Sequence, residues 1–462
     1  MLQTPSAPVI SERPTNAAVA RTLLVLALPV LFEQILNMLV GLNDTYLANH
    51  LPQNAADAGA AVGTMAYLLW FVGLLVTWIG AGSTAIISRA RGARHQSLAN
   101  RVTGQSISAA IVLGFLTAGI LLLAAHQIVA ATQLRGQASN FALTYLRLLC
   151  ISLPPTTVML MGSACLRGGG DTLTPALVMV LVDIINMLAS FALCRGWWGL
   201  PVYGFNGIAA GTVIAYFAGG LVQFLALWIG TRGAKLHLHR MRLQWQTLKR
   251  MLRIGIPAGT ESMLDFAANF SVIAVINRMD ATNAMASAHV NTIRLESLSF
   301  LWGIVFCIAA STMVGNSLGR RDPALARRYA YLAYAIGGGV MTFCGLLMMT
   351  IGHYPAAWLS PDNAHIVHLT TQCLFVAGFT QSGFAAAVIF SAALRGAGDT
   401  FAVMALNLTS IFILRFAGVL VVGLWLHMGL VAVWIVLSCE LFLRGGLMFV
   451  RFANGAWEKI EV

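Results

Sequence analysis

Two stretches of the sequence decide the fold: Ser163-Ala-Cys-Leu-Arg-Gly-Gly-Gly-Asp-Thr172 and Ser391-Ala-Ala-Leu-Arg-Gly-Ala-Gly-Asp-Thr400. They are identical at eight of ten positions and are offset by 228 residues. The same offset relates three further matches: Pro29 with Pro257, Glu33 with Glu261, and Ser83-Thr84 with Ser311-Thr312. Matches at separate places that share one offset indicate an internal duplication of the whole chain.

The composition excludes a soluble globular protein. The 462 residues are 58% hydrophobic and 10% charged, whereas soluble domains carry about 25% charged residues. Apolar runs of roughly 20 residues, the length that crosses a bilayer, recur along the chain. Twelve spans are predicted, with approximate ends: 20–42, 61–88, 102–126, 141–165, 173–195, 207–229, 254–277, 284–314, 329–352, 366–393, 401–424 and 430–450.

The duplication and the spans together predict an all-α polytopic membrane protein of twelve transmembrane helices in two six-helix lobes. An even number of spans returns the chain to its starting side, so the lobes are expected to be related by a pseudo-two-fold axis along the membrane normal. The expected divisions are a tail at 1–19, an N-lobe at 20–231, a basic linker at 232–252 and a C-lobe with a short tail at 253–462.

The net charge of +12 is explained by topology rather than by nucleic-acid binding. Lys and Arg gather at both termini and in alternate loops, while the loops of the other side hold Arg135, Arg195 and Arg278. The positive-inside rule then predicts cytoplasmic termini. No Gly-x-x-x-x-Gly-Lys-Ser/Thr motif occurs, so ATP-driven pumping is not expected.

Acidic and amide residues inside the spans are the candidate functional residues, because such groups are costly in a bilayer. Three sets share one helical face each: Glu33, Asn37 and Asp44; Asp183, Asn186 and Ser190; Glu261, Asp265 and Asn269. Comparison of equivalent positions in the two halves ranks these candidates. Asp44 corresponds to Val272 and Asp183 to Ile411, so the shared scaffold does not need those acids. Glu33 corresponds to Glu261, and an acid that both halves retain suits a gating role.

These groups suit coupling to a cation. Burial and a second nearby acid both raise the pKa of a carboxylic acid, so a buried acid can load and release a proton. Alternatively, Asp44, Asp183 and Asn186 could form an oxygen cage for Na⁺. The acids could also pair with a cationic organic substrate, with aromatic and Met side chains around its apolar body.

The duplicated loops and one histidine have a structural interpretation beside a functional one. The duplicated loops look like phosphate cradles, but we expect tight hairpins with Asp171 and Asp399 as N-caps. A gate latch is the alternative to the tight hairpin, and the residues Arg167 and Arg395 of these loops are expected at the cytoplasmic surface. His289 is expected to be a packing histidine, with a proton relay as the alternative.

The chain resembles the multidrug and toxic compound extrusion (MATE) family. The resemblance covers about residues 20–450 and lies in Leu166–Thr172, Leu394–Thr400, Val40-Gly-Leu-Asn-Asp-Thr-Tyr46 and Ala310-Ser-Thr-Met-Val-Gly315. It implies a multidrug and cation antiporter with a cation site in the N-lobe and a central cleft.

The resemblance also implies roles for individual residues. Asp44 matches an acid implicated in proton or Na⁺ coupling, and Asn186 matches an Asn of the same site. Ser190 stands where the family usually has Asp, and Asp183 lies one turn before Asn186 instead. Asp265 falls where one branch has a coupling Glu, but the acid that this branch places on a later helix is replaced by Phe384.

The sequence therefore predicts a secondary antiporter of a bacterial inner membrane that exports organic, cationic amphipathic compounds in exchange for H⁺ or Na⁺, by rocking of two lobes. We expect a monomer with no cofactor besides the coupling ion. Two alternatives stay open: a flippase for lipid-linked saccharides, which needs a cationic cleft, and an intramembrane transferase, for which no catalytic motif is found.

Overall fold

The computed structural model describes residues 14–132, 134, 136–231, 233–280, 284–361 and 363–460. These residues form helices and no strands. Arg135, Arg232 and the outermost parts of the two predicted tails, 1–13 and 461–462, lie outside the described residues.

The first half of the chain forms one helical bundle. Its helices are α1 (Asn16–Asn49), α2 (Ala55–Gly92), α3 (Gln96–Leu123), α4 (Ala125–Ala131), α5 (Gln137–Gly168), α6 (Leu173–Arg195) and α7 (Phe205–Ile229). Short 3₁₀ turns follow at Trp197–Gly199 and Leu238–Arg240.

The second half repeats the arrangement. Its helices are α8 (Trp245–Met279), α9 (Ala284–Gly319), α10 (Pro323–Ile351), α11 (His353–Leu359), α12 (Ala364–Ala397), α13 (Thr400–Ser410), α14 (Ala417–Leu420) and α15 (Leu430–Ala453). The π-helical segments Ile411–Phe416 and Val421–Trp425 flank α14, and a 3₁₀ turn at Ala456–Lys459 follows α15.

Each predicted span coincides with a helix or, for 401–424, with the continuous helical stretch that begins at α13. Within the described residues, eleven helices are long and apolar enough to cross a membrane. The twelfth predicted span, 254–277, lies in the 35-residue helix α8. The charged residues at the start of α8 and the acids Glu261 and Asp265 lower its mean hydropathy, which explains why composition alone does not identify α8 as a membrane span. The all-α polytopic fold is confirmed.

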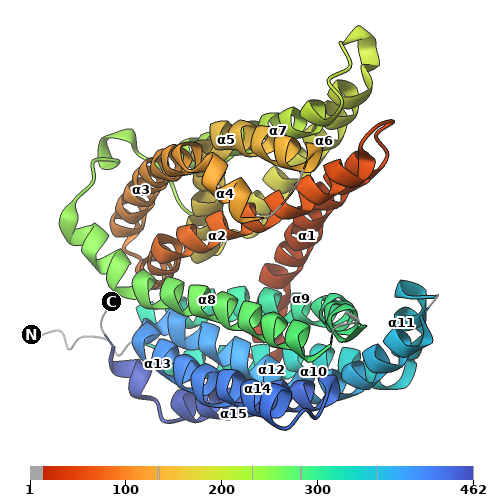
Figure 1. Cartoon of the computed structure of the whole chain (residues 1–462). Coiled ribbons are helices and arrows are strands. Elements are labelled where there is room, and N and C mark those ends of the chain that lie inside the picture. Colours follow the sequence, from red (N-terminus) through yellow and green to blue (C-terminus); the bar gives the residue numbers. More distant parts are fainter. Residues whose placement is uncertain are drawn as a thin grey trace, which may run out of the picture.

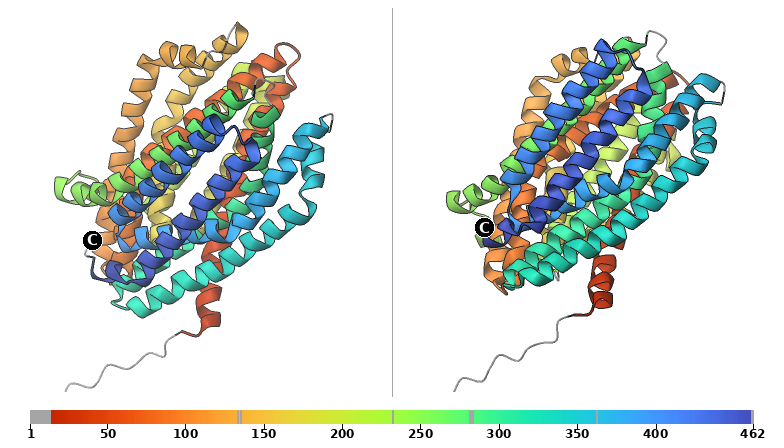
Figure 2. Two further views of the ribbon diagram at one scale, coloured as in Figure 1. Left: turned by 60° about the horizontal axis from the view of Figure 1, so that its bottom comes forward. Right: turned by 90° about the horizontal axis from the view of Figure 1, so that it is seen from below.

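The two bundles lie side by side, close together near the start of α8 and the C-terminus and further apart at the opposite end (Figure 1). Figure 2 shows the long helices roughly parallel, with the start of α8 and the C-terminus at the same end of the molecule. The glycines of this end, here called the terminal end, allow the approach. A Cβ at Gly92 of α2 would overlap the Asn316 carbonyl of α9, and a Cβ at Gly319 would overlap the Arg89 carbonyl.

The first helix of each half begins in the other half's bundle. Leu23 and Leu26 of α1 are buried against Phe306 and Ile389 of the second half, while Leu36 and Val40 farther along α1 pack with α5, α6 and α7 of the first half.

Helix α8 mirrors this arrangement. Met251 and Ile254, the residues 228 positions after Leu23 and Leu26, pack among α2, α3 and α5 of the first half. Val272 and Ile276 of the same helix pack within the second half. The predicted division at residue 253 stays a prediction, and α1 and α8 each contribute to both bundles.

The duplicated loops fold as hairpins, but their two halves differ in detail. The Asp171 carboxylate accepts a hydrogen bond from the Thr174 amide at 3.0 Å and so caps the start of α6 as predicted, although Thr172, not Asp171, stands at the N-cap position. Asp399 stands at the predicted N-cap position of α13, but its side chain makes no capping bond and instead accepts from Arg451 Nε at 2.8 Å. The glycines serve helix packing, because Gly168 lies against the Thr84 backbone and Gly396 against the Ser311 backbone.

Candidate functional site

The carboxylate of Asp44 lies at the centre of a hydrogen-bonded cluster in the first bundle. Tyr145 Oη and Thr212 Oγ1 donate to its Oδ2 at 2.8 and 2.6 Å, and Asn186 Nδ2 donates to its Oδ1 at 3.2 Å. The residue is 3% exposed. Four helices, α1, α5, α6 and α7, therefore converge on one acid, and no basic side chain of the described residues pairs with it.

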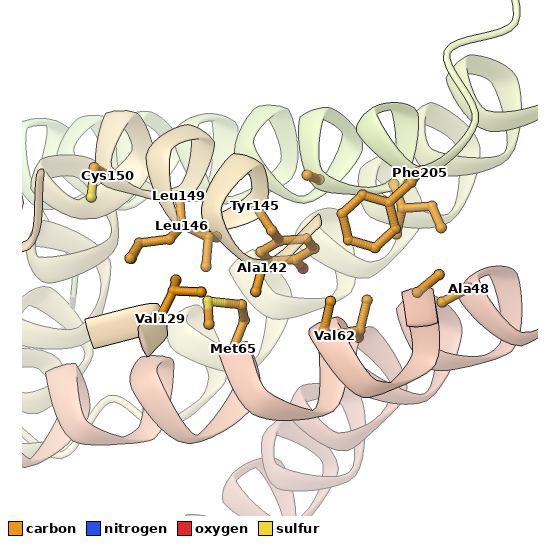
Figure 3. Packing of buried hydrophobic residues seen from close by; sticks show 14 of the residues in the cluster. Ala48, Val62, Met65, Val129, Ala142, Tyr145, Leu146, Leu149, Cys150 and Phe205 are labelled. Atoms are coloured by element: carbon orange, nitrogen blue, oxygen red, sulfur yellow. The ribbon is translucent and has the colours of Figure 1, made fainter. Parts of the chain in front are cut away.

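Close packing of α6 on α7 assembles this cluster. A Cβ at Gly211 would overlap Ser190, so only glycine lets α7 approach α6 here. Thr212 follows directly, and Asn186 lies one turn before Ser190 on the facing side of α6. The Tyr145 ring is buried in the apolar cluster of the first bundle, 5.9 Å from the Phe205 ring, which fixes the direction of its hydroxyl (Figure 3).

Asn186 is the hub of the cluster. Its Nδ2 lies 3.0 Å from Thr212 Oγ1 and 3.4 Å from Ser190 Oγ, and its Oδ1 accepts from Asn43 Nδ2 at 2.8 Å. The structure thus brings three of the predicted site residues, Asp44, Asn186 and Ser190, into one site. Their role in coupling stays a prediction.

Asp183 stands apart from this cluster. It lies one turn before Asn186 on α6 and is half-buried, and its Oδ2 is buried without a hydrogen-bond partner in the described part of the chain. The predicted set of Asp44, Asp183 and Asn186 for Na⁺ therefore has two members in direct contact and one outside.

The matched acids Glu33 and Glu261 form matched ion pairs. Arg167 Nη1 lies 3.3 Å from both carboxylate oxygens of Glu33, and Arg395 Nη1 lies 2.8 Å from Glu261 Oε1. Glu261 also accepts from Asn407 Nδ2. Because 228 residues separate both the acids and the arginines, the two ion pairs are counterparts within the duplication.

Two other predicted residues lie outside these groups. Asn37 is exposed and makes no hydrogen bond to the described residues. His289 is 3% exposed, its ring lies 5.5 Å from the Trp434 ring, and its Nδ1 has no partner among them. Its surroundings are those of a packing residue in the second bundle.

Asp265 belongs to a charge network of the second bundle. Its Oδ1 lies 3.3 Å from Arg415 Nη1 and 3.5 Å from Arg444 Nη1, and its side chain is 40% exposed. Both arginines also pair with Glu440, which is fully buried, at 2.8 and 3.1 Å. Asn269 accepts from Arg415 at 3.1 Å. Asp265 is therefore neutralised by two guanidinium groups, unlike Asp44.

The sequence reasoning missed Tyr145, Thr212 and Glu440. Tyr145 and Thr212 carry no signal, since single hydroxyl groups are common in spans. Glu440 did carry one: an acid in the apolar run 430–450 with Arg444 four residues later, the spacing of a helical ion pair.

A cavity of about 400 Å³ lies between the bundles, and Arg167 and Arg395 both line it. Its other lining residues come from α2, α5, α8, α9 and α12. The arginine side chains are 17% and 28% exposed. They do not lie on the outer surface as predicted, because the ion pairs with Glu33 and Glu261 hold them between the bundles. That this end faces the cytoplasm stays a prediction.

Comparison with known proteins agrees with this architecture. The sequence profile described as MatE matches residues 29–192 and 257–421, one stretch in each half of the duplication. The chain belongs to the MatE family. The two matched stretches carry Asp44 and Asn186 in the first half and the ion pair of Glu261 and Arg395 in the second.

Relatives of this MatE protein match over nearly their whole length. A probable multidrug resistance protein NorM of Thermotoga maritima is 26% identical over 96% of this chain and 94% of its own. The multidrug resistance protein MdtK of Proteus mirabilis is 27% identical over 88% and 86%. A crystal structure of MATE in the bent conformation superimposes with a TM-score of 0.86 at 19% identity, covering 96% and 98% of the two chains. The protein is thus a multi-pass membrane protein with the MATE fold.

Proposed function

We propose that this protein is a monomeric secondary antiporter that exports small organic compounds from the cell in exchange for H⁺ or Na⁺. The names of its relatives, which are multidrug resistance proteins, support the substrate class. We place it in the inner membrane with both termini in the cytoplasm, as the distribution of Lys and Arg predicts. The sequence further predicts cationic, amphipathic substrates.

The observation that carries the proposal is the buried carboxylate of Asp44. It has three neutral donors, Tyr145, Thr212 and Asn186, and no counter-charge in the described residues. An acid in this setting can bind a proton or a small cation without first breaking an ion pair.

Coupling also requires that loading the site moves a helix. Asp44 lies near one end of α1, and the first turns of the same helix pack in the second bundle. A change in the bonds at Asp44 therefore bears on a helix that contacts both bundles. This supports alternating access by rocking of the two lobes.

Asp265 is the second candidate for coupling, and its surroundings argue against it. It is held by Arg415 and Arg444, so a cation would have to compete with two guanidinium groups. Asp183 has no such partner among the described residues and lies one turn before Asn186 on α6, which leaves it as an auxiliary acid beside the cluster.

One observation supports the flippase alternative, which needs a cationic cleft: two arginines line the cavity. The volume of about 400 Å³ suits a drug-sized molecule, since ligand pockets for such molecules measure about 300–1,000 Å³. A lipid-linked oligosaccharide is larger. We therefore keep the export of small organic compounds as the proposed function over the flippase and the transferase.

The test is efflux of a fluorescent organic compound from proteoliposomes under a proton gradient or a Na⁺ gradient imposed separately. One gradient should drive efflux, and Asp44→Asn should abolish that response while the protein elutes as a folded species. Asp265→Asn is the matched control, because it changes an acid of the opposite lobe in the same way. Efflux that neither gradient drives overturns the antiporter, and normal coupling in Asp44→Asn with loss in Asp265→Asn moves the site.

A further inference from the structure

The cavity between the bundles is basic at one end. It extends along α2 from Gly73 to Thr84 and includes Arg167 and Arg395, which lie at the last turns of α5 and α12. None of the residues that line it is acidic. Beyond the arginines α2 and α9 close the terminal end at Gly92 and Gly319. The basic end is therefore the closed end.

Both arginines have guanidinium N–H groups that make no hydrogen bond to the described residues. Arg167 uses Nη1 for Glu33, and Arg395 uses Nη1 for Glu261. Nε and Nη2 of each make no hydrogen bond to the residues that the structure describes, and these nitrogens are not enclosed by protein. A guanidinium group carries five N–H donors in a planar fork that matches the two oxygens of a carboxylate or phosphate.

The ion pairs are oriented with their positive side toward the cavity. Glu33 and Glu261 are 6% and 7% exposed and do not line the cavity, whereas the arginines do. The acids thus lie behind the arginines. An oxyanion in the cavity meets guanidinium N–H groups first, at a depth where water screens poorly.

The hydroxyl groups of the cavity add one donor. Thr77, Thr84 and Ser262 already donate to backbone carbonyls of their own or a neighbouring helix. Ser311 lines the cavity, and its Oγ makes no hydrogen bond within the described ranges. It belongs to α9, one residue before Thr312, which donates to the Arg167 carbonyl at 3.0 Å. Ser311 is therefore placed near the backbone of Arg167 with its hydroxyl uncommitted.

We propose that the closed end of this cavity binds the oxyanion of an amphipathic organic substrate, held by Arg167, Arg395 and Ser311. The inference rests on the proposed export function and specifies its substrates: molecules with a carboxylate or phosphate at one end and an apolar or cationic body. Purely cationic compounds, which the sequence predicts as substrates, would leave the basic end unoccupied. Zwitterions satisfy both expectations.

The duplication gives the site its symmetry. Arg167 and Arg395 are counterparts, so each lobe contributes one guanidinium group to the same ligand. An oxyanion bound by both would hold the terminal ends of α5 and α12 together. Its departure would remove that link between the lobes.

The experiment measures binding of a fluorescent carboxylate, pyrenebutyrate, and its methyl ester to the full-length protein in phosphatidylcholine nanodiscs, without any gradient. The carboxylate should bind at least tenfold more tightly than the ester. Arg167→Gln and Arg395→Gln should each weaken binding of the carboxylate by about 10- to 100-fold and leave the ester unchanged. Arg395→Lys should retain part of the preference. Arg147→Gln, which removes an exposed guanidinium from the same helix as Arg167, is the matched control and should behave as wild type.

A purely structural role of the ion pairs makes a different prediction. If Arg167 only supports Glu33, then Glu33→Gln and Arg167→Gln should impair both probes equally, and that result overturns the proposal. We expect Glu33→Gln to maintain or increase the affinity for the carboxylate, because it frees Nη1.

Two further outcomes complete the test. Equal affinity for acid and ester also overturns the proposal, and so does displacement of the probe by phosphatidylglycerol in the nanodisc, which would assign the site to a lipid headgroup. The assay needs no transport. If gradient-driven efflux fails but the carboxylate still binds more tightly than the ester, only the proposed export function is overturned. If efflux is normal but the preference for the carboxylate is absent, only this inference is overturned.

Discussion

Substitution of Gly92 by Ala should separate the two bundles at the terminal end. The new Cβ would overlap the Asn316 carbonyl oxygen and lie 2.7 Å from its carbonyl carbon and 3.0 Å from its Cα. Carbon atoms in contact are normally about 3.5–4.0 Å apart, so α2 and α9 must part by about 1 Å. Backbone atoms cannot rotate away as a side chain can.

The expected cost follows from this overlap. An added methyl group in a packed interface costs about 1–3 kcal/mol, which changes the equilibrium between closed and open terminal ends about 5- to 150-fold. Since the methyl group is accommodated once the lobes separate, the penalty falls on the closed state alone. Gly319→Ala on the opposite helix should act in the same direction, because its Cβ would overlap the Arg89 carbonyl.

The assay is double electron–electron resonance between spin labels at His95 and Ala324, which are exposed at the terminal end of the two bundles, with the native cysteines replaced. Gly92→Ala should shift the distance distribution to longer values. Gly119→Ala is the matched control, because a Cβ there meets no atom within 4 Å. An unchanged distribution in Gly92→Ala, with the protein folded, would refute the conclusion that glycine contacts close this end.

Two further predictions concern stability. Glu440→Gln should lower the free energy of unfolding by about 3 kcal/mol, because it leaves Arg415 and Arg444 buried without their shared acid. Thermal unfolding in detergent would measure this loss of stability. If a double variant that adds Arg415→Gln is destabilised by the sum of the two single effects, the charge network is contradicted. Trp457→Ala should release the C-terminal segment, because the fully buried ring stacks on Phe452 at 4.7 Å and its Nε1 donates to the Phe452 carbonyl. Limited proteolysis should then remove residues after Arg451 faster than in wild type, and an equal rate would count against this anchoring role.

The sequence was sufficient for the architecture because the duplication and the spans are strong, independent signals. The offset of 228 predicted two similar bundles, and it also pairs the ion pairs of Glu33 and Glu261, which no reading of one half alone would connect. The MATE resemblance was confirmed by a profile that matches both halves.

The site was predictable only where an unusual residue marks it. Asp44 stands out as an acid in an apolar run, but its partners Tyr145 and Thr212 are ordinary membrane residues whose importance depends on which helices meet. Helical spacing placed Asp183 with Asn186, yet a difference of one turn separates it from the cluster. The inward direction of Arg167 depends on the long-range contact with Glu33, which a loop motif does not reveal.

The crossing of α1 and α8 between the bundles has the geometry of a domain-swapped dimer joined into one chain. In a swapped dimer each protomer completes its partner by exchanging an identical element. Here Leu23 and Leu26 fill the second bundle while Met251 and Ile254 fill the first. Each half needs the first helix of the other to fill its core, so we expect the two halves expressed as separate chains to assemble with each other. The covalent linker fixes a pairing that the helices themselves specify.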